Sequence, residues 1–164
     1  MKQQDNLNWE ARQFEDEDHG SVVLRSHYFG LRKIFEGWKP AAPFENLAQM
    51  ESHYQKMSTK LGFEVGVPEV RVNFLGYRLL QQNKLDEALA TFKWNAEHYP
   101  ESANVYDSLG DGLTAAKQFE QAVDSYKKAM ELGEKTNHQF KATFKQNYEN
   151  ARKRLEEALA MESN

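Results

Sequence analysis

One spacing constrains the fold of this chain of 164 residues more than any other feature: a Leu-Gly pair at Gly76 recurs 34 residues later, at Gly110. In the same register Ala88 is matched by Ala122. A period of this length is typical of stacked helical hairpins, because one hairpin cannot bury its own apolar face without a neighbour. It predicts pairs of helices over these ranges: 69–82 with 85–98, and 103–116 with 119–132.

The two glycines predict how the helices of a pair meet. Glycine inside a helix costs about 1 kcal/mol relative to alanine. A cost that recurs in register at Gly76 and Gly110 indicates a close approach of the second helix of each pair. We expect Phe92 and Tyr126 to fill the space between hairpins.

The residues after the second pair predict one more helix. Gly133 is expected to close the helix before it. Thr136, with a glutamine three residues on, predicts a capping box that opens a long helix ending near Ala160. Between the paired helices, the turns are expected at Asn83-Lys84 and at Lys117-Gln118.

The N-terminal part has a different pattern. The aromatic stretch 9–14 predicts a short strand, and an acidic loop follows it. Apolar residues at helical spacing predict helices over 26–36 and 44–61. The glycines and proline of 62–68 predict a break between segments.

Composition excludes several classes of function. A net charge of −4 and a pI near 5.8 argue against a nucleic-acid-binding protein. No run of 18 apolar residues predicts a membrane span, and the absence of cysteine excludes disulfides and thiolate sites. No metal-ligand spacing or phosphate-binding glycine loop occurs, so we expect neither metal nor cofactor. The compartment stays open, with cytoplasm and periplasm both compatible.

The periodic part resembles the tetratricopeptide repeat. Its signature positions are held by Val72, Leu75-Gly76, Leu79, Ala88, Phe92 and Pro100, and again by Tyr106, Leu109-Gly110, Leu113, Ala122 and Tyr126. Val72 departs from the usual large aromatic residue, and Glu134 stands where the second repeat would carry its proline. The resemblance implies an α-α superhelix of two hairpins over 69–136, with a capping helix over 137–164.

The same resemblance implies a protein- or peptide-binding groove on the first helix of each hairpin. The residues that would line it are Asn73, Tyr77, Gln81, Asn104, Asp107 and Asp111. Asp107 and Asp111 lie one helical turn apart, so this groove should disfavour a C-terminal carboxylate and accept a basic or neutral segment. Two alternatives stay open: the side chains are merely solvated, or the helix over 44–61 occupies the groove.

A second resemblance concerns the N-terminal part. Residues 14–22, followed by Tyr28 and Leu31, resemble the C-terminal end of an α/β-hydrolase family of serine esterases, some of which carry tetratricopeptide repeats after the catalytic domain. The resemblance implies that His19 is a catalytic histidine. On this reading residues 1–40 are a hydrolase remnant and 41–68 a linker helix.

No G-x-S-x-G nucleophile motif occurs, so we expect no hydrolase activity from the chain alone. We interpret the chain as the C-terminal portion of such an esterase, serving protein–protein contact. One alternative is a hydrolase in which His19 serves a nucleophile on another polypeptide, and another is a dimerisation tail. Without a sheet to cover them, the apolar residues of 1–40 should either pair with a second copy or fold onto the repeats.

Overall fold

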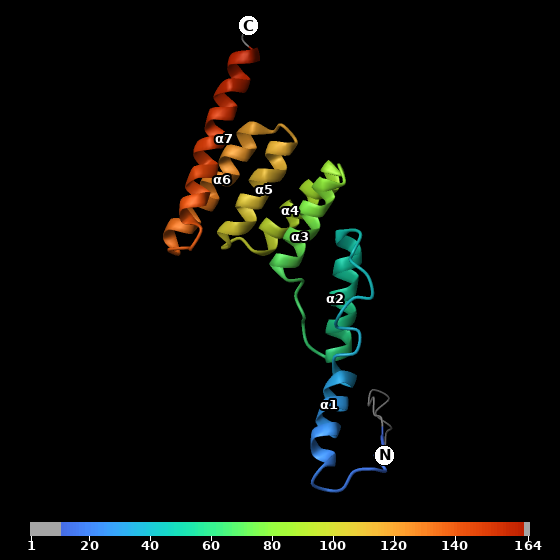
Figure 1. The fold of residues 1–164 in the computed structure, drawn as a ribbon. Coiled ribbons are helices and arrows are strands. Elements are labelled where there is room, and N and C mark those ends of the chain that lie inside the picture. Colours follow the sequence, from blue (N-terminus) through green and yellow to red (C-terminus); the bar gives the residue numbers. More distant parts are fainter. Residues whose placement is uncertain (1–10, 163–164) are drawn as a thin grey trace. The chain divides into compact units, whose positions relative to one another are not determined.

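The computed structural model describes residues 11–162; residues 1–10 and 163–164 lie outside the described part. The chain divides into two compact units, Met1–Ala41 and Ala42–Asn164. The described residues form helices and no strand, so the fold is mainly all-α (Figure 1). No described helix has the length and apolar character needed to cross a membrane. The helices are α1 (Val22–Ile34), α2 (Leu47–Leu61), α3 (Glu69–Gln81), α4 (Leu85–His98), α5 (Ala103–Ala115), α6 (Phe119–Lys135) and α7 (Lys141–Glu162).

The first unit contains α1 and the irregular segment before it. The strand expected over 9–14 is absent from residues 11–14, and residues 9 and 10 lie outside the described part. An isolated strand without a pairing partner is not stable, which accounts for the difference. The acidic loop instead forms a turn that leads into α1, in which Asp18 Oδ1 accepts hydrogen bonds from the backbone N–H of Gly20 (2.7 Å) and of Ser21 (2.9 Å). Helix α1 therefore begins at Val22, four residues before the expected start.

The second unit contains two helix pairs, α3 with α4 and α5 with α6, whose contacts repeat with the sequence period. A Cβ atom added to Gly76 would lie 2.5 Å from the Phe92 ring, and one added to Gly110 would lie 2.6 Å from the Tyr126 ring. The glycines are thus required by rings of their own pair. The Phe92 ring also lies against Gly112, at 2.8 Å from an added Cβ, so this ring does reach between the pairs as expected.

The turns within the pairs lie where the sequence predicts them. Asn83 and Lys117 have positive φ angles of 59° and 58°. In each turn the following residue donates its backbone N–H five residues back, Lys84 to Leu79 and Gln118 to Leu113, both at 2.9 Å. These are the bonds by which a left-handed residue ends a helix and satisfies its last carbonyls.

The end of α6 differs from expectation. Gly133 does not end a helix: α6 continues to Lys135, and the Phe144 ring of α7 lies 2.7 Å from the position of a Cβ on Gly133. The expected capping box is also wrong, because Thr136 Oγ1 donates back to the Leu132 carbonyl (2.9 Å) and α7 begins only at Lys141. Glycine ends a helix in some contexts and admits a ring in others, and the sequence does not distinguish the two.

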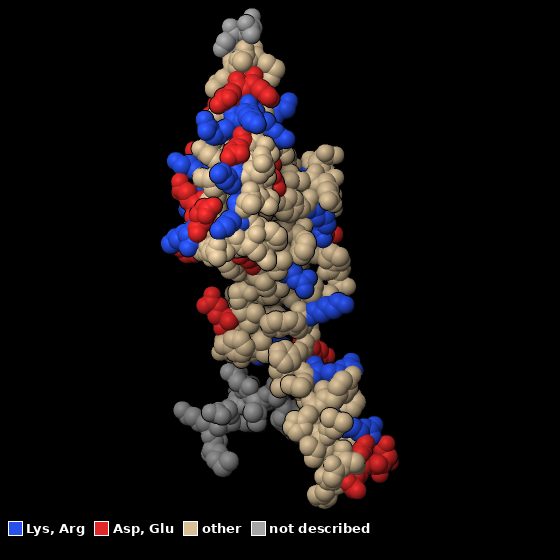
Figure 2. Space-filling model, turned by 60° about the vertical axis from the view of Figure 1, so that its left-hand side comes forward, with Lys and Arg blue, Asp and Glu red and all other residues tan. Residues whose placement is uncertain are grey.

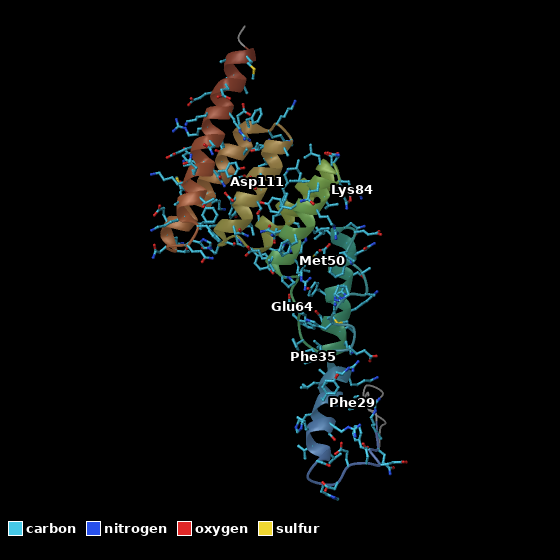
Figure 3. All side chains as sticks on the ribbon, in the orientation of Figure 1. Phe29, Phe35, Met50, Glu64, Lys84 and Asp111 are labelled. Carbon is cyan, nitrogen blue, oxygen red and sulfur yellow. The ribbon has the colours of Figure 1, made fainter. Side chains whose placement is uncertain are left out.

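Helix α2 belongs to the core of the second unit. Met50 is only 2 % exposed and packs with apolar residues of α3 and α4, namely Val72, Leu75, Leu79, Ala88 and Phe92 (Figure 3). Trp94 Nε1 on α4 also donates to Glu51 Oε1 at 3.1 Å. The segment 41–68 is therefore more than a linker.

Helix α7 covers α6 with the middle of its apolar stripe. Phe144 and Ala151 are buried, whereas Phe140 and Leu159 at the two ends of the stripe stay about half exposed. Its outer face carries Lys and Arg side chains interspersed with Glu (Figure 2). Arg152 and Glu156 of α7 form an ion pair at 3.7 Å. A solvated helix face of this kind has no large patch of one charge.

Candidate functional site

The expected groove residues lie on α3 and α5, and most of them bind other side chains of the same unit. Asn73 is buried, and its Oδ1 accepts a hydrogen bond from Asn95 Nδ2 on α4 (2.8 Å). Asn104 Nδ2 donates to Glu69 Oε1 at 3.1 Å. Gln81 is exposed at the end of α3. Of these polar residues, Asn73 is thus poorly placed for a peptide backbone.

Asp111 is the centre of a polar network. Its Oδ2 accepts from the Tyr77 hydroxyl of α3 (2.8 Å) and its Oδ1 from the Tyr126 hydroxyl of α6 (2.6 Å). Ser108 Oγ lies 3.1 Å from the Tyr77 oxygen. Because the single phenol proton goes to the carboxylate, Ser108 is the donor in that contact. Asp111 therefore joins helices of both pairs.

Burial makes the two phenols persistent donors. It raises the pKa of Tyr77 and of Tyr126 above the ordinary phenol value, and the Asp111 charge raises both further. Both hydroxyls therefore keep their protons at neutral pH. Each of the two Asp111 oxygens then has a neutral hydrogen-bond donor.

Asp107, one turn before Asp111, is less well compensated. It is half-buried, and its Oδ1 accepts one hydrogen bond, from Asn147 Nδ2 of α7 (2.9 Å). Burial raises the pKa of Asp107 to about 6, and the Asp111 charge adds to this, while the Asn147 bond opposes it. Within residues 11–162, neither Asp107 nor Asp111 forms an ion pair with a basic side chain.

Two exposed apolar side chains on α3 adjoin this network, and the sequence reading missed them. Val70 is 55 % exposed and Phe74 is 70 % exposed. They precede Tyr77 and Gln81 at spacings that put all four on one face of α3. The signal was available, because Phe74 falls opposite the predicted core positions of its own helix. Tyr77, which binds Asp111, thus has exposed apolar neighbours on its own face of α3, and we call Val70 and Phe74 the apolar border.

The alternative that α2 occupies this surface is wrong. Met50 of α2 joins Val72 and Leu79, which lie on the side of α3 opposite to Phe74. Figure 1 shows α3 and α4 between α2 and α5. The surface that carries Phe74, Asp107 and Asp111 is therefore left open by α2.

His19 lies apart from any such network. It is exposed in the turn before α1. Within the described residues its imidazole has no recorded hydrogen bond to a serine or a carboxylate. The Ser21 hydroxyl of the same turn instead accepts from the Asp18 backbone N–H at 3.0 Å. A base needs a nucleophile and an orienting group within hydrogen-bond reach, and the described residues provide neither.

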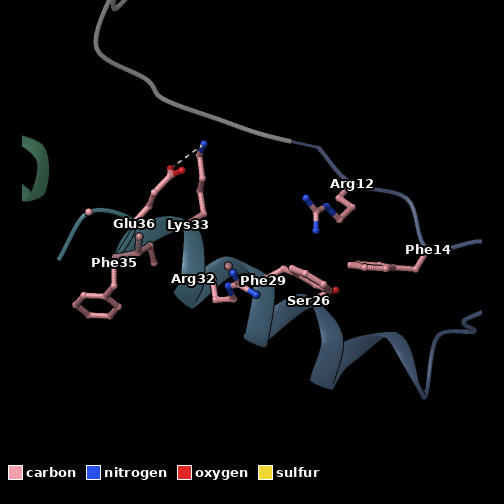
Figure 4. Close-up of a pocket in the computed structure, with 11 residues that line it drawn as sticks. Arg12, Phe14, Ser26, Phe29, Arg32, Lys33, Phe35 and Glu36 are labelled. Atoms are coloured by element: carbon pink, nitrogen blue, oxygen red, sulfur yellow. Dashed lines mark ion pairs between the residues drawn. The ribbon is translucent and has the colours of Figure 1, made fainter. Parts of the chain in front are cut away.

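The first unit also has a hollow of about 950 Å³ beside the C-terminal half of α1 (Figure 4). Phe14, Phe29 and Phe35 line it together with basic side chains. His19 is not among its lining residues. No group of histidines and carboxylates in residues 11–162 is arranged to hold a metal ion.

Comparison of the chain with protein-family models and with curated proteins finds no match.

Proposed function

We propose that this chain is a protein–protein interaction module of the tetratricopeptide type, and that the α3–α5 surface binds a peptide segment carrying a basic side chain. Two observations support the repeat assignment. The ring-on-glycine contacts of Gly76 and Gly110 recur in register, and so do the left-handed turns at Asn83 and Lys117.

The observation that carries the binding proposal is the pair Asp107 and Asp111. Two carboxylates one turn apart, both partly buried, have only neutral donors among the described residues, which are two phenols and one carboxamide. A buried negative charge without a counter-charge is unfavourable, as the raised pKa of Asp107 reflects. A cationic ligand group would supply the missing charge, and strongly perturbed carboxylates mark such sites more often than chance.

The apolar border defines the rest of the ligand. Phe74 and Val70 offer an open apolar contact beside the carboxylates. We expect a segment with lysine or arginine next to an apolar residue. A segment that ends in a free carboxylate at Asp107 should be rejected, because like charges then meet.

Peptide-array binding followed by fluorescence anisotropy on soluble peptides tests this proposal. Basic-apolar peptides should bind more tightly than versions in which glutamate replaces lysine, and the preference should shrink as salt is added. Asp107→Asn should remove most of the preference for lysine. Asp124→Asn, an exposed carboxylate of α6, is the matched control and should leave binding unchanged. Equal binding of lysine and glutamate peptides would refute the proposal.

We further propose that the first unit derives from the C-terminal end of an α/β-hydrolase esterase. This rests on the resemblance around His19 and on the apolar side chains of α1 that are open to solvent. The competing function, a hydrolase that lends His19 to a nucleophile elsewhere, predicts ester cleavage only when a second polypeptide is added. Hydrolysis of a nitrophenyl acyl ester by the chain alone, lost in His19→Ala, would contradict the interaction-module proposal.

A further inference from the structure

Helix α1 carries a stripe of four exposed apolar side chains, which we call the α1 stripe: Leu24, Tyr28, Leu31 and Phe35, the last at the helix C-cap. Their exposed fractions are 80 %, 55 %, 55 % and 50 %. No residue of α1 is buried. The positions alternate in steps of four and three, which keeps all four on one narrow face. The Phe35 N–H donates to the Leu31 carbonyl, so the helical path includes Phe35, and it ends before Gly37, whose φ is 84°.

The described segment before α1 covers a different flank of this helix. Phe14 stacks on Phe29 with ring centroids 5.5 Å apart. Arg25 binds Asp16 at 2.8 Å and Glu17 at 2.7 Å. Phe29 and Arg25 point away from the α1 stripe on the helical wheel. The segment 11–20 is thus held on the flank and, among the described residues of the first unit, leaves the stripe exposed.

The α1 stripe has the spacing by which one helix packs into another. Alternating steps of three and four are the seam positions of paired helices. Two of its four side chains are aromatic, and each aromatic side chain can contribute about 150–250 Å² to an interface. Together the four reach several hundred Å² (about 300–600 Å² is the largest patch on a typical monomer), which approaches one side of a standard interface.

Charge favours one arrangement of two such stripes. Arg25 binds Asp16 and Glu17, and Lys33 binds Glu36, yet each end keeps an excess of one sign. Glu15 and Asp18 keep segment 11–20 acidic, and Arg32 and Lys39 keep the C-terminal end of α1 basic. Two copies in parallel would place like charges together. Two antiparallel copies would place the acidic end of one beside the basic end of the other. A two-fold pair of this kind uses the same surface on both copies.

We propose that the α1 stripe is a homotypic interface, in which α1 of one copy packs antiparallel against α1 of a second copy. The two-fold axis then passes between Tyr28 and Leu31, so Tyr28 of one copy lies beside Leu31 of the other. Leu24 of one copy lies beside Phe35 of the other. This interface is independent of the α3–α5 surface, so each of the two proposals can fail without the other.

Sedimentation equilibrium of the full chain over a range of concentrations tests the interface. We expect twice the monomer mass, and Leu31→Glu should weaken the association roughly tenfold or more, because each dimer contains two central charges. Met161→Glu changes a more exposed apolar residue outside the stripe and should leave the mass unchanged. Far-UV circular dichroism should be the same for all three chains, since Leu31 joins no buried core cluster of the described residues.

Disulfide trapping tests the orientation, because the natural sequence has no cysteine. Leu24→Cys and Phe35→Cys should each cross-link poorly alone and readily when mixed, whereas a parallel pair would give the opposite result. A monomer at every concentration, with the stripe then covered by another part of the chain or by a different protein, would overturn the proposal, and so would a dimer that Leu31→Glu leaves intact.

Discussion

The half-buried carboxyl group of Asp107 should make the stability of this protein depend on pH in an unusual direction. Its pKa rises from an ordinary 3.8 to about 6 in the folded chain, mainly through burial. An acid with a raised pKa in the folded state binds its proton more tightly there than in the unfolded state. Below pH 3.8 the carboxyl group is protonated in both states and leaves the free energy of unfolding unchanged. This free energy falls as the pH rises from 3.8 toward 6, and the loss is complete above pH 6.

The size of the effect follows from the difference between the two pKa values. About two pKa units correspond to roughly 3 kcal/mol in the free energy of unfolding. The side chain is only half-buried, so solvent screening reduces this figure, and we expect a loss of about 1–2 kcal/mol above pH 6. Asp107→Asn removes the charge and keeps an oxygen that can accept from Asn147. The variant should therefore be more stable than the natural chain by that amount at pH 7.5 and no more stable at pH 3.5.

Urea unfolding followed by circular dichroism at both pH values measures the effect. Asp124→Asn serves as the control and should behave like the natural chain, because its carboxylate is exposed. A gain from Asp107→Asn that is equal at both pH values would refute the electrostatic argument, because a gain in packing does not depend on protons. A loss of stability at pH 7.5 would show that the charge is compensated in solution. If stability rises while lysine-peptide binding falls, Asp107 is retained for binding.

Three further changes test the packing and the turns. Gly110→Ala puts a methyl group 2.6 Å from the Tyr126 ring and should lower the free energy of unfolding by about 1–3 kcal/mol. Gly66→Ala, the control, meets open space and should change this free energy little. Equal effects of the two changes in chemical denaturation would contradict the close approach. Lys117→Gly relieves a positive φ of 58° and should raise the midpoint of thermal unfolding, by an amount equivalent to about 1 kcal/mol; a lower midpoint would be inconsistent with a strained turn. Phe144→Ala should cost about 3–5 kcal/mol and expose α7 to hydrogen exchange, while the half-exposed Phe140→Ala should not; unchanged protection of α7 would exclude the docking described for it.

Sequence periodicity predicted the helix pairs well because the same contact occurs twice. Gly76 and Gly110 recur at one spacing, and each meets a ring. Gly133 has no partner at that spacing, so its ring contact with α7 was not predictable, and its usual role at helix ends gave the wrong boundary. A repeated glycine indicates packing more reliably than a single one.

The candidate site was predictable on its own helices and not across helices. Helical spacing places Asp107 and Asp111 on one face of α5. The groups that bind them come from α3, α6 and α7, at separations of 15 to 40 residues along the chain. Such partners depend on how helices pack, which a single sequence does not specify. The exposure of Phe74, by contrast, follows from helical spacing alone, because Phe74 falls opposite the core positions of α3.

The two phenols on Asp111 have a consequence for how a ligand would meet this surface. Tyr77 comes from one helix pair and Tyr126 from the next, and both donate to the same carboxylate. Asp111 and Tyr126 belong to the same pair, so only the Tyr77 bond crosses between pairs, and a change in tilt between them would disturb that bond. The hydrogen bond between Tyr77 and Asp111 therefore holds the two pairs at one relative tilt before a ligand binds. A ligand would lose little free energy in ordering such a preorganised surface, and its association should show no slow conformational phase.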